Sequence, residues 1–229
     1  MLRVRFSYPA PLINKDTMKS ITVNNVNINL HDGPIGVSVS GGADSTILLY
    51  ILMKYITEPI HIYTCVGKSK NRVAPHIALD VIGKCIDMTG RKNNEIFHHS
   101  SFVDNQHITN MFFLPRNHID TNVVNYVYTA TTANPPLEVT NSFQEIEQSV
   151  LDERDPTVIK PYYGGFDNKF YVPFRNIDKQ TIRGMYEELN VLEELFPMTR
   201  SCESVTLTEG HCGECWWCQE RLWGFGRMV

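Results

Sequence analysis

The chain has 229 residues, of which 42% are hydrophobic and 20% are charged, and its formal net charge is −4 at pH 7. These values are typical of a water-soluble protein with one domain, or one domain and an appendage. The negative charge argues against the basic surface on which general nucleic-acid binding depends. No apolar run approaches the roughly 18 residues of a membrane helix, and the first residues lack the apolar region of a signal peptide. We therefore expect a cytoplasmic protein with no membrane partner and no direct nucleic-acid binding.

Residues 1–33 are predicted to form an N-terminal β extension. Residues 2–6, 21–23 and 26–30 each alternate apolar and polar side chains, which is the pattern of a strand with one buried face. Asn24-Asn25 supplies a hairpin turn between the last two. The residues of this extension indicate no chemistry.

The glycine turn at residues 40–42 carries the first functional prediction. A strand pattern precedes it, and the apolar residues after Ser45 indicate a buried helix. Strand, glycine turn and helix together suit a phosphate, because glycine lets the backbone come close and the free N–H groups of the first helical turn point at the anion. The hydroxyls of Ser40 and Ser45 add donors, and Asp44 or Ser45 is expected to cap the helix. The simpler alternative is a glycine turn between two core elements.

The turn lacks the lysine of a Walker loop. Its string Ser-Gly-Gly-x-Asp-Ser resembles instead the signature of the PP-loop ATP pyrophosphatases, which adenylate a substrate and release pyrophosphate. We therefore predict an ATP site formed by Val39, Ser40, Gly41, Gly42, Ala43, Asp44, Ser45 and Thr46.

Alternating strand and helix patterns follow this turn. Strands are predicted at residues 59–66 and 95–102, with a helix to about residue 57 and a second helix around residues 73–86. This alternation predicts a doubly wound parallel α/β sheet over residues 34–200, with ligands beyond the carboxyl ends of the strands.

The second half of the core is less regular. A helix is predicted over residues 119–128, opened by Pro115-Arg116-Asn117, and Arg116 there would suit a phosphate or substrate contact. The alternative is a capping asparagine beside a solvated arginine. Residues 141–155 are predicted to form an acidic surface helix and residues 169–174 a strand, followed by a helix capped by Asp178.

Four of the six cysteines lie close together in the predicted C-terminal segment, residues 201–229. Their spacing is C-x9-C-x2-C-x2-C, so that one short turn presents successive thiolates to one ion. Four thiolates satisfy tetrahedral zinc, although four thiolates also hold an iron–sulfur cluster. We favour structural zinc, bound in a reducing compartment by Cys202, Cys212, Cys215 and Cys218.

The glycine turn and the cysteine cluster together resemble the 7-cyano-7-deazaguanine synthase family. Matching strings occur, in the order found in that family, at residues 40–45, 115–117, Lys179, 201–202, 212–218, Arg221 and 224–225. The resemblance implies a PP-loop enzyme that uses ATP, Mg²⁺ and ammonia to convert 7-carboxy-7-deazaguanine to its amide or nitrile. It implies catalytic roles for Asp44, Arg116 and Lys179, and it implies structural zinc and a homodimer.

Residues 129–138 depart from the family pattern, because they lack its acidic substrate motif. Three alternatives therefore remain. The chain could be another PP-loop enzyme, such as a tRNA thiolation enzyme, it could join a deazaguanine to another target, or it could be a non-catalytic nucleotide-binding module.

Overall fold

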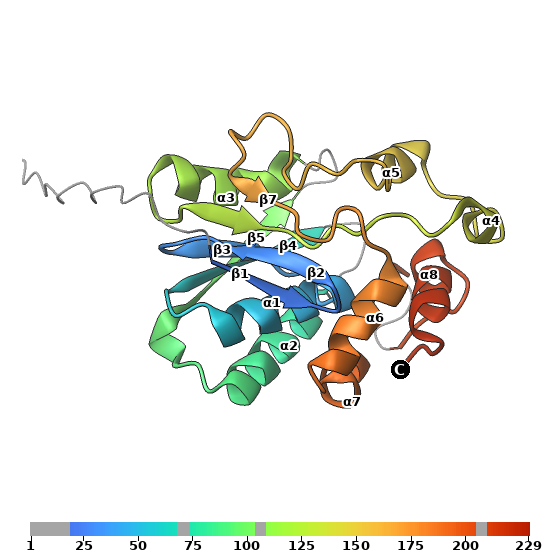
Figure 1. The fold of residues 1–229 in the computed structure, drawn as a ribbon, viewed down its shortest axis with the longest axis horizontal. Helices are drawn as coiled ribbons and strands as arrows, with labels where there is room; N and C mark the ends of the chain where they lie inside the picture. The colour runs from blue at the N-terminus through green and yellow to red at the C-terminus, as the bar shows by residue number, and fades with distance from the viewer. Residues whose placement is uncertain (1–18, 68–73, 104–108, 205–209) are drawn as a thin grey trace, which may run out of the picture.

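The computed structural model describes residues 19–67, 74–103, 109–204 and 210–229, and its centre is a parallel sheet of five strands (Figure 1). The strands lie in the order β5-β4-β3-β6-β7. The chain moves outward from β3 to β5 and then returns to β6 on the other side of β3, so that the strand order reverses at the carboxyl end of β3. Such a reversal is where α/β sheets bind ligands. The predicted parallel α/β fold is confirmed, with strands β3 Ile35–Ser38, β4 Ile60–Gly67, β5 Ile96–Val103, β6 Tyr126–Tyr128 and β7 Phe170–Tyr171.

Helices cover both faces of the sheet. Helix α1, Ala43–Tyr55, joins β3 to β4, and α2, Ala74–Thr89, joins β4 to β5. Figure 1 shows these two helices on one face and α3, Thr109–Asp120, on the other. Every residue of α1 from Ser45 to Met53 is buried, which explains why its sequence is apolar on most faces.

The N-terminal hairpin consists of β1, Lys19–Val23, and β2, Val26–Leu30. Asn24 and Asn25 form its turn with φ values of 46° and 61°, as a two-residue hairpin requires. The side chain of Asn24 donates to the carbonyl of Thr181 at 2.9 Å, and the apolar face of the hairpin joins the main core through Val23, Ile28 and Leu30. The strand predicted at residues 2–6 lies outside the described residues.

The C-terminal helices pack at the carboxyl edge of the sheet. Helix α6, Lys179–Glu188, begins after Asp178 as predicted, and the carboxylate of Asp178 accepts the N–H of Thr181 at 2.9 Å. Helix α8, Trp216–Phe225, lies so close to α6 that a Cβ added at Gly224 would be 2.2 Å from Cβ of Lys179. Shorter pieces are α7, Leu192–Leu195, and the 3-10 turns η1, Asn93–Glu95, and η2, Phe196–Met198. Across the described ranges, each helix is too short or too polar to span a membrane.

Three predicted elements are wrong in extent. The helix predicted over residues 119–128 ends with α3 at Asp120, and residues 126–128 form β6 because they pair with β3, a distant strand that helical spacing cannot reveal. The predicted acidic helix is reduced to α5, Gln148–Glu153, with α4, Leu137–Thr140, before it. Between them the backbone N–H of Gln144 donates to Gln219 of α8 instead of continuing a helix. The strand predicted at residues 169–174 shortens to β7, since Pro173 cannot donate to the ladder.

Candidate functional site

The turn after β3 packs its backbone closely against helix α2. Gly41 has a φ of 81°, and a Cβ there would lie 2.8 Å from Cγ2 of Ile77 and 3.0 Å from the backbone nitrogen of Ala78. Both the left-handed backbone and the lack of space therefore require glycine. Gly42 is the N-cap of α1, and its carbonyl accepts the N–H and the hydroxyl of Thr46 at 3.1 and 2.9 Å.

The N-terminus of α1 has no side-chain cap, so the prediction that Asp44 or Ser45 caps it is wrong. The hydroxyl of Ser45 instead lies 3.2 Å from the carbonyl of Gly42 and 3.2 Å from the hydroxyl of Ser40, which closes the turn on itself. The first N–H groups of α1 thus have no side-chain acceptor at the positive end of the helix dipole. An anion can fill that role.

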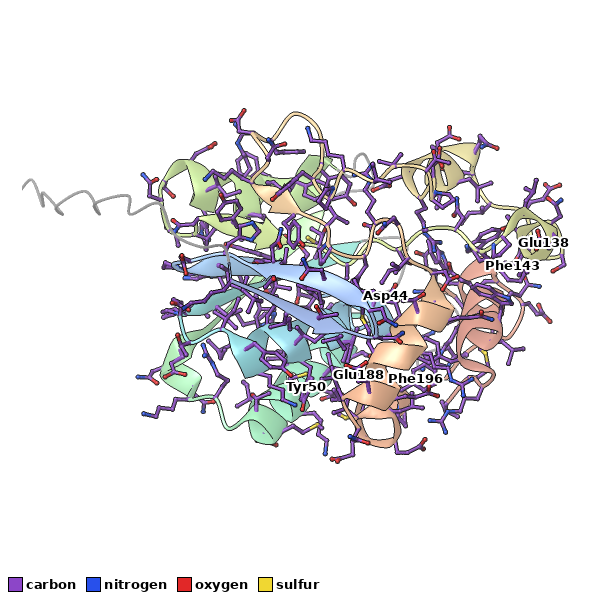
Figure 2. The ribbon with its side chains drawn as sticks, viewed as in Figure 1. Asp44, Tyr50, Glu138, Phe143, Glu188 and Phe196 are labelled. Carbon is purple, nitrogen blue, oxygen red and sulfur yellow. The ribbon has the colours of Figure 1, made fainter. Side chains whose placement is uncertain are left out.

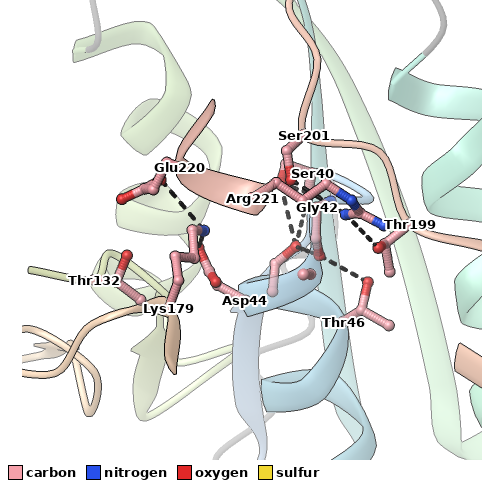
Figure 3. Close-up of polar contacts among 12 residues, drawn as sticks. Ser40, Gly42, Asp44, Thr46, Thr132, Lys179, Thr199, Ser201, Glu220 and Arg221 are labelled. Carbon is pink, nitrogen blue, oxygen red and sulfur yellow. Dashed lines mark hydrogen bonds and ion pairs between the residues drawn. The ribbon is translucent and has the colours of Figure 1, made fainter. Parts of the chain in front are cut away.

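Four charged side chains form a buried cluster beside this turn, and Figure 3 labels three of them, Asp44, Lys179 and Glu220. Lys179 of α6 forms an ion pair with Asp44 of α1, and its Nζ lies 3.8 Å from Oε2 of Glu220 on α8. Glu220, whose side chain is 0% exposed, also pairs with Arg154. Two cations and two carboxylates therefore balance, yet Oδ1 of Asp44 is buried without a hydrogen-bond partner. Figure 2 shows Asp44 at the end of the sheet near α6.

Further contacts fix the position of this cluster. Arg154 donates to the carbonyls of Thr132 and Ala133, each at 2.9 Å, and its guanidinium lies 5.3 Å from the ring centroid of Trp217. The hydroxyl of the fully buried Tyr186 donates to the carbonyl of Ala43 at 2.7 Å. Burial raises the pKa of Tyr186 well above its usual value, so the hydroxyl remains a donor at neutral pH.

Arg221 ties the C-terminal helix to the chain next to the turn. Its buried guanidinium donates to the hydroxyl of Thr199 at 2.9 Å and to the carbonyl of Phe196 at 3.0 Å. Burial lowers the pKa of Arg221 to about 10, which still leaves it charged at neutral pH. One residue beyond Thr199, the backbone N–H of Arg200 donates to the carbonyl of Gly41 at 2.9 Å. The turn is therefore supported from the C-terminal segment.

A cavity of about 450 Å³ opens at the glycine turn. Its walls include the turn, the start of α1, residues 129–132 after β6, Lys179 of α6, Arg200, and Trp217 of α8. A larger cavity of about 750 Å³ lies around Pro135 and Pro136, but no residue of the turn lines it. The smaller cavity is the candidate site because it combines the uncapped helix terminus with the charged cluster.

The structure brings most of the predicted nucleotide residues together. Those that line the cavity are Val39, Ser40, Gly42, Asp44, Ser45 and Lys179. Arg116 is not among the lining residues. It lies in the second half of α3 rather than at a helix start, 2.9 Å from Asp120, with its guanidinium over the ring of Phe166. Sequence patterns did not indicate Arg154, Arg200 or Glu220, because each is brought to the site from a different part of the chain.

Two residues that line the cavity, Cys65 and Tyr163, carry groups that could act as nucleophiles if they were ionised. Cys65 of β4 lies 3.4 Å from the hydroxyl of Ser101, and burial raises the pKa of its thiol. Burial also raises the pKa of Tyr163 to about 12, and its hydroxyl donates to Glu153 at 2.9 Å. Both groups are therefore neutral at pH 7, which disfavours either as an activated nucleophile.

The four C-terminal cysteines converge on one point. Their sulfur atoms all lie within 4.8 Å of one another, and those of Cys212 and Cys218 are 3.8 Å apart. Tetrahedral zinc with Zn–S bonds of about 2.3 Å places its sulfurs about 3.8 Å apart. Gly213, with a φ of 80°, makes the tight turn between ligands. This group of side chains can hold a metal ion.

The electrostatics of the cysteine group are compatible with a bound cation. Although burial opposes it, backbone N–H groups of Cys215 and Glu214 lower the pKa of Cys212 to about 6. Burial and the neighbouring sulfurs raise the pKa of Cys218. The raised pKa of Cys218 opposes its ionisation, whereas a coordinated metal deprotonates its thiols.

No protein family matches this chain, and no curated protein matches it in sequence. Three solved structures share part of its fold: a U34-tRNA thiolase with its 4Fe–4S cluster from Methanococcus maripaludis, an NMN synthetase from Francisella tularensis, and a protein described as a tRNA methyltransferase subunit from Methanocaldococcus jannaschii. Their identities to this chain are 11%, 13% and 12%, with TM-scores of 0.42, 0.43 and 0.34. The matches cover 70%, 85% and 69% of this chain and 57%, 78% and 75% of theirs, so the chain spans less than two thirds of the thiolase. Likeness of this degree does not indicate what the chain binds.

Proposed function

We propose that this protein is an ATP-dependent carbon–nitrogen ligase that adenylates a carboxylate and then amidates it. The observation that carries the proposal is the uncapped N-terminus of α1, which follows a glycine turn and opens into a cavity beside Asp44 and Lys179. Backbone N–H groups and a buried ammonium are the donors that a polyphosphate needs.

The residues of the cavity fit a nucleotide and its magnesium ion. Gly42 lines the cavity without a side chain, and Ser40 and Ser45, which also line it, supply hydroxyls. The unpartnered Oδ1 of Asp44 is a hard oxygen ligand of the kind that Mg²⁺ prefers. ATP supplies the activated phosphorus for a carboxylate to attack, and pyrophosphate is the leaving group.

The chain's own side chains would position this reaction rather than form covalent bonds. Lys179, held between Asp44 and Glu220, would stabilise negative charge that builds up on the leaving phosphates. Ammonia then displaces AMP from the activated acid to give an amide. A second ATP would adenylate the amide oxygen with release of pyrophosphate, and loss of AMP and a proton would then give the nitrile.

The substrate that we propose is 7-carboxy-7-deazaguanine, on the resemblance of the glycine turn and the cysteine cluster to the synthase family. The cavity supports a flat heteroaromatic acid, because the aromatic side chains of Tyr63, Phe112, Tyr163 and Trp217 line it. Flat rings bind such walls by stacking. Its volume of about 450 Å³ is within the usual range for small-molecule sites.

A turnover assay with 7-carboxy-7-deazaguanine, ATP, Mg²⁺ and ammonium, read by mass spectrometry, tests the proposal. We expect AMP together with the amide or nitrile, and we expect Asp44→Ala to abolish both while the circular dichroism spectrum is unchanged. If AMP forms without a deazaguanine product, the protein adenylates a substrate, but 7-carboxy-7-deazaguanine is not that substrate. If neither AMP nor a deazaguanine product forms, the proposal that the protein is this enzyme is rejected.

Sulfur transfer is a second candidate, because Cys65 lies in the same cavity. The raised pKa of its thiol weighs against it, since a sulfur carrier works as a thiolate. Cys65→Ser separates the two functions: a ligase should keep its AMP production, whereas a thiolation enzyme should lose sulfur transfer entirely.

We further propose that the C-terminal cysteines bind structural zinc. Four sulfur ligands would leave no coordination position for water, so the ion would stabilise the fold rather than take part in the reaction. The four clustered cysteines are free thiols in the structure, so their sulfurs are available as ligands.

A further inference from the structure

Three histidines converge under α3, away from the glycine turn. His61 belongs to β4, His99 to β5 and His118 to α3, and one ring nitrogen from each lies within 4.8 Å of the others. In the parallel register His61 faces Phe97 and Tyr63 faces His99. Positions two apart on a strand share a face, so His61 and His99 emerge side by side beneath α3.

The rings already contact one another through their nitrogens. Nδ1 of His61 lies 3.0 Å from Nε2 of His99, and these two rings are stacked at 4°. The ring of His118 stands across His99 at 83°, with centroids 4.8 Å apart. The hydroxyl of Tyr63 lies 2.8 Å from Nδ1 of His118, which leaves Nε2 of that ring for another partner. All three histidines are half-buried, so an ion can reach them from solvent.

We propose that His61, His99 and His118 form a second metal site, which takes one divalent transition-metal ion such as zinc. Three imidazoles and one open position are a common zinc arrangement, with Zn–N bonds of about 2.0–2.1 Å and ring nitrogens therefore about 3.3 Å apart. The 3.0 Å contact between His61 and His99 is near this value, and the remaining separations, all within 4.8 Å, would close with a small rotation of the side chains.

The hydrogen bonds are compatible with this ligand set. With a metal on Nε2, the proton of His118 resides on Nδ1 and is donated to the oxygen of Tyr63. Partners of this kind orient the metal-binding ring and raise its basicity. The shared proton between His61 and His99 moves to the outer nitrogen of its own ring, so binding releases no proton. Burial lowers the pKa of all three rings, to about 4 for His61, which keeps them in the neutral form that binds metal.

The proposed site differs from both the cysteine group and the nucleotide cavity. None of the three histidines lines the cavity, but Tyr63 does, and it bonds directly to His118. The ion would therefore sit behind the cavity wall. The proposed site contains only nitrogen ligands, so it suits zinc, nickel, cobalt or copper rather than magnesium.

The test uses the full chain with the metal content of its cysteine site measured first. Equilibrium dialysis against zinc, read by elemental mass spectrometry, should show one further equivalent bound by the wild-type protein. His99→Ala should remove that equivalent and leave the cysteine-bound metal in place. The matched control His76→Ala, an exposed histidine of α2, should keep both.

Tyr63→Phe provides a graded second test, because it retains all three ligands. Loss of the hydrogen bond to His118 should lower the affinity for the second zinc ion by about 10- to 100-fold. Histidine ring nitrogen NMR signals of the wild-type protein should shift for three rings as zinc is added. The proposal is overturned if the wild-type protein binds no second equivalent of zinc. It is also overturned if His99→Ala still binds the second equivalent, or if His76→Ala loses it to the same extent. Histidine NMR would then identify the cluster as a stacked set of rings without metal.

Discussion

Glu220→Gln is expected to remove much of the stability of this protein without changing side-chain volume. Glu220 is completely buried and pairs with Arg154 and Lys179, whose side chains are 5% and 6% exposed. At 3.8 Å from Lys179, the lost charge removes roughly 4 kcal/mol of attraction at an effective dielectric constant of about 20. The amide oxygen of glutamine can still accept from Arg154, but the cluster is left with two cations and only Asp44. Unbalanced buried pairs of this kind cost about 3–5 kcal/mol.

Urea unfolding of the metal-loaded protein measures this loss directly. Glu187→Gln is the matched control, because Glu187 forms an ion pair with Arg183 at 2.7 Å but both side chains are more than 40% exposed. The control should change the free energy of unfolding by no more than about 0.5 kcal/mol. A loss below about 1 kcal/mol for Glu220→Gln, with an unchanged denaturant slope, would refute the argument that the cluster is dry and charge-balanced.

Three further predictions concern the turn, the metal and pH. Gly41→Ala should destabilise more than the control Gly90→Ala in urea unfolding, because both positions have positive φ but a Cβ meets other atoms only at Gly41. The strain alone costs about 1–3 kcal/mol, so equal losses would show that the close approach is unimportant. Cys215→Ser should lower metal content and melting temperature together, and full metal content in the mutant would contradict the four-ligand site. Burial lowers the pKa of His31 from 6.5 to about 4, so the unfolded chain binds more protons in that window and stability falls as pH drops through it. His31→Gln should flatten that fall in thermal melts between pH 7 and pH 4.5, and an unchanged fall would assign it to other groups.

The glycine turn could be predicted from sequence because all of its chemistry lies in one short string. Strand pattern, glycines and a buried helix occupy neighbouring positions, and the structure has them in that order. The cysteine group could be predicted for the same reason, since three of its ligands lie within seven residues. Lys179 was expected only from resemblance, and the structure adds a physical basis, because α6 brings its ammonium to Asp44 across 135 residues of chain.

The partners of these elements could not be predicted locally. Arg154 and Glu220 are 66 residues apart, and each looks like a solvated surface charge in its own stretch of sequence. Their pairing depends on how α8 packs beside α6, where Gly224 permits the close approach. β6 was mistaken for part of a helix for a related reason: its identity comes from pairing with β3, not from its own residues.

The turn and the cysteine segment form one structural unit, although they are about 160 residues apart. Arg221 of α8 holds Thr199, and the next residue donates its N–H to Gly41. Glu220, adjacent to Arg221, holds Lys179 against Asp44. Helix α8 begins directly after Cys215 and contains Cys218, so an ion bound by the cysteines fixes the helix that positions both contacts. A metal bound by the cysteines would therefore influence the shape of the candidate site, because the donors that support the turn belong to the same C-terminal part of the chain.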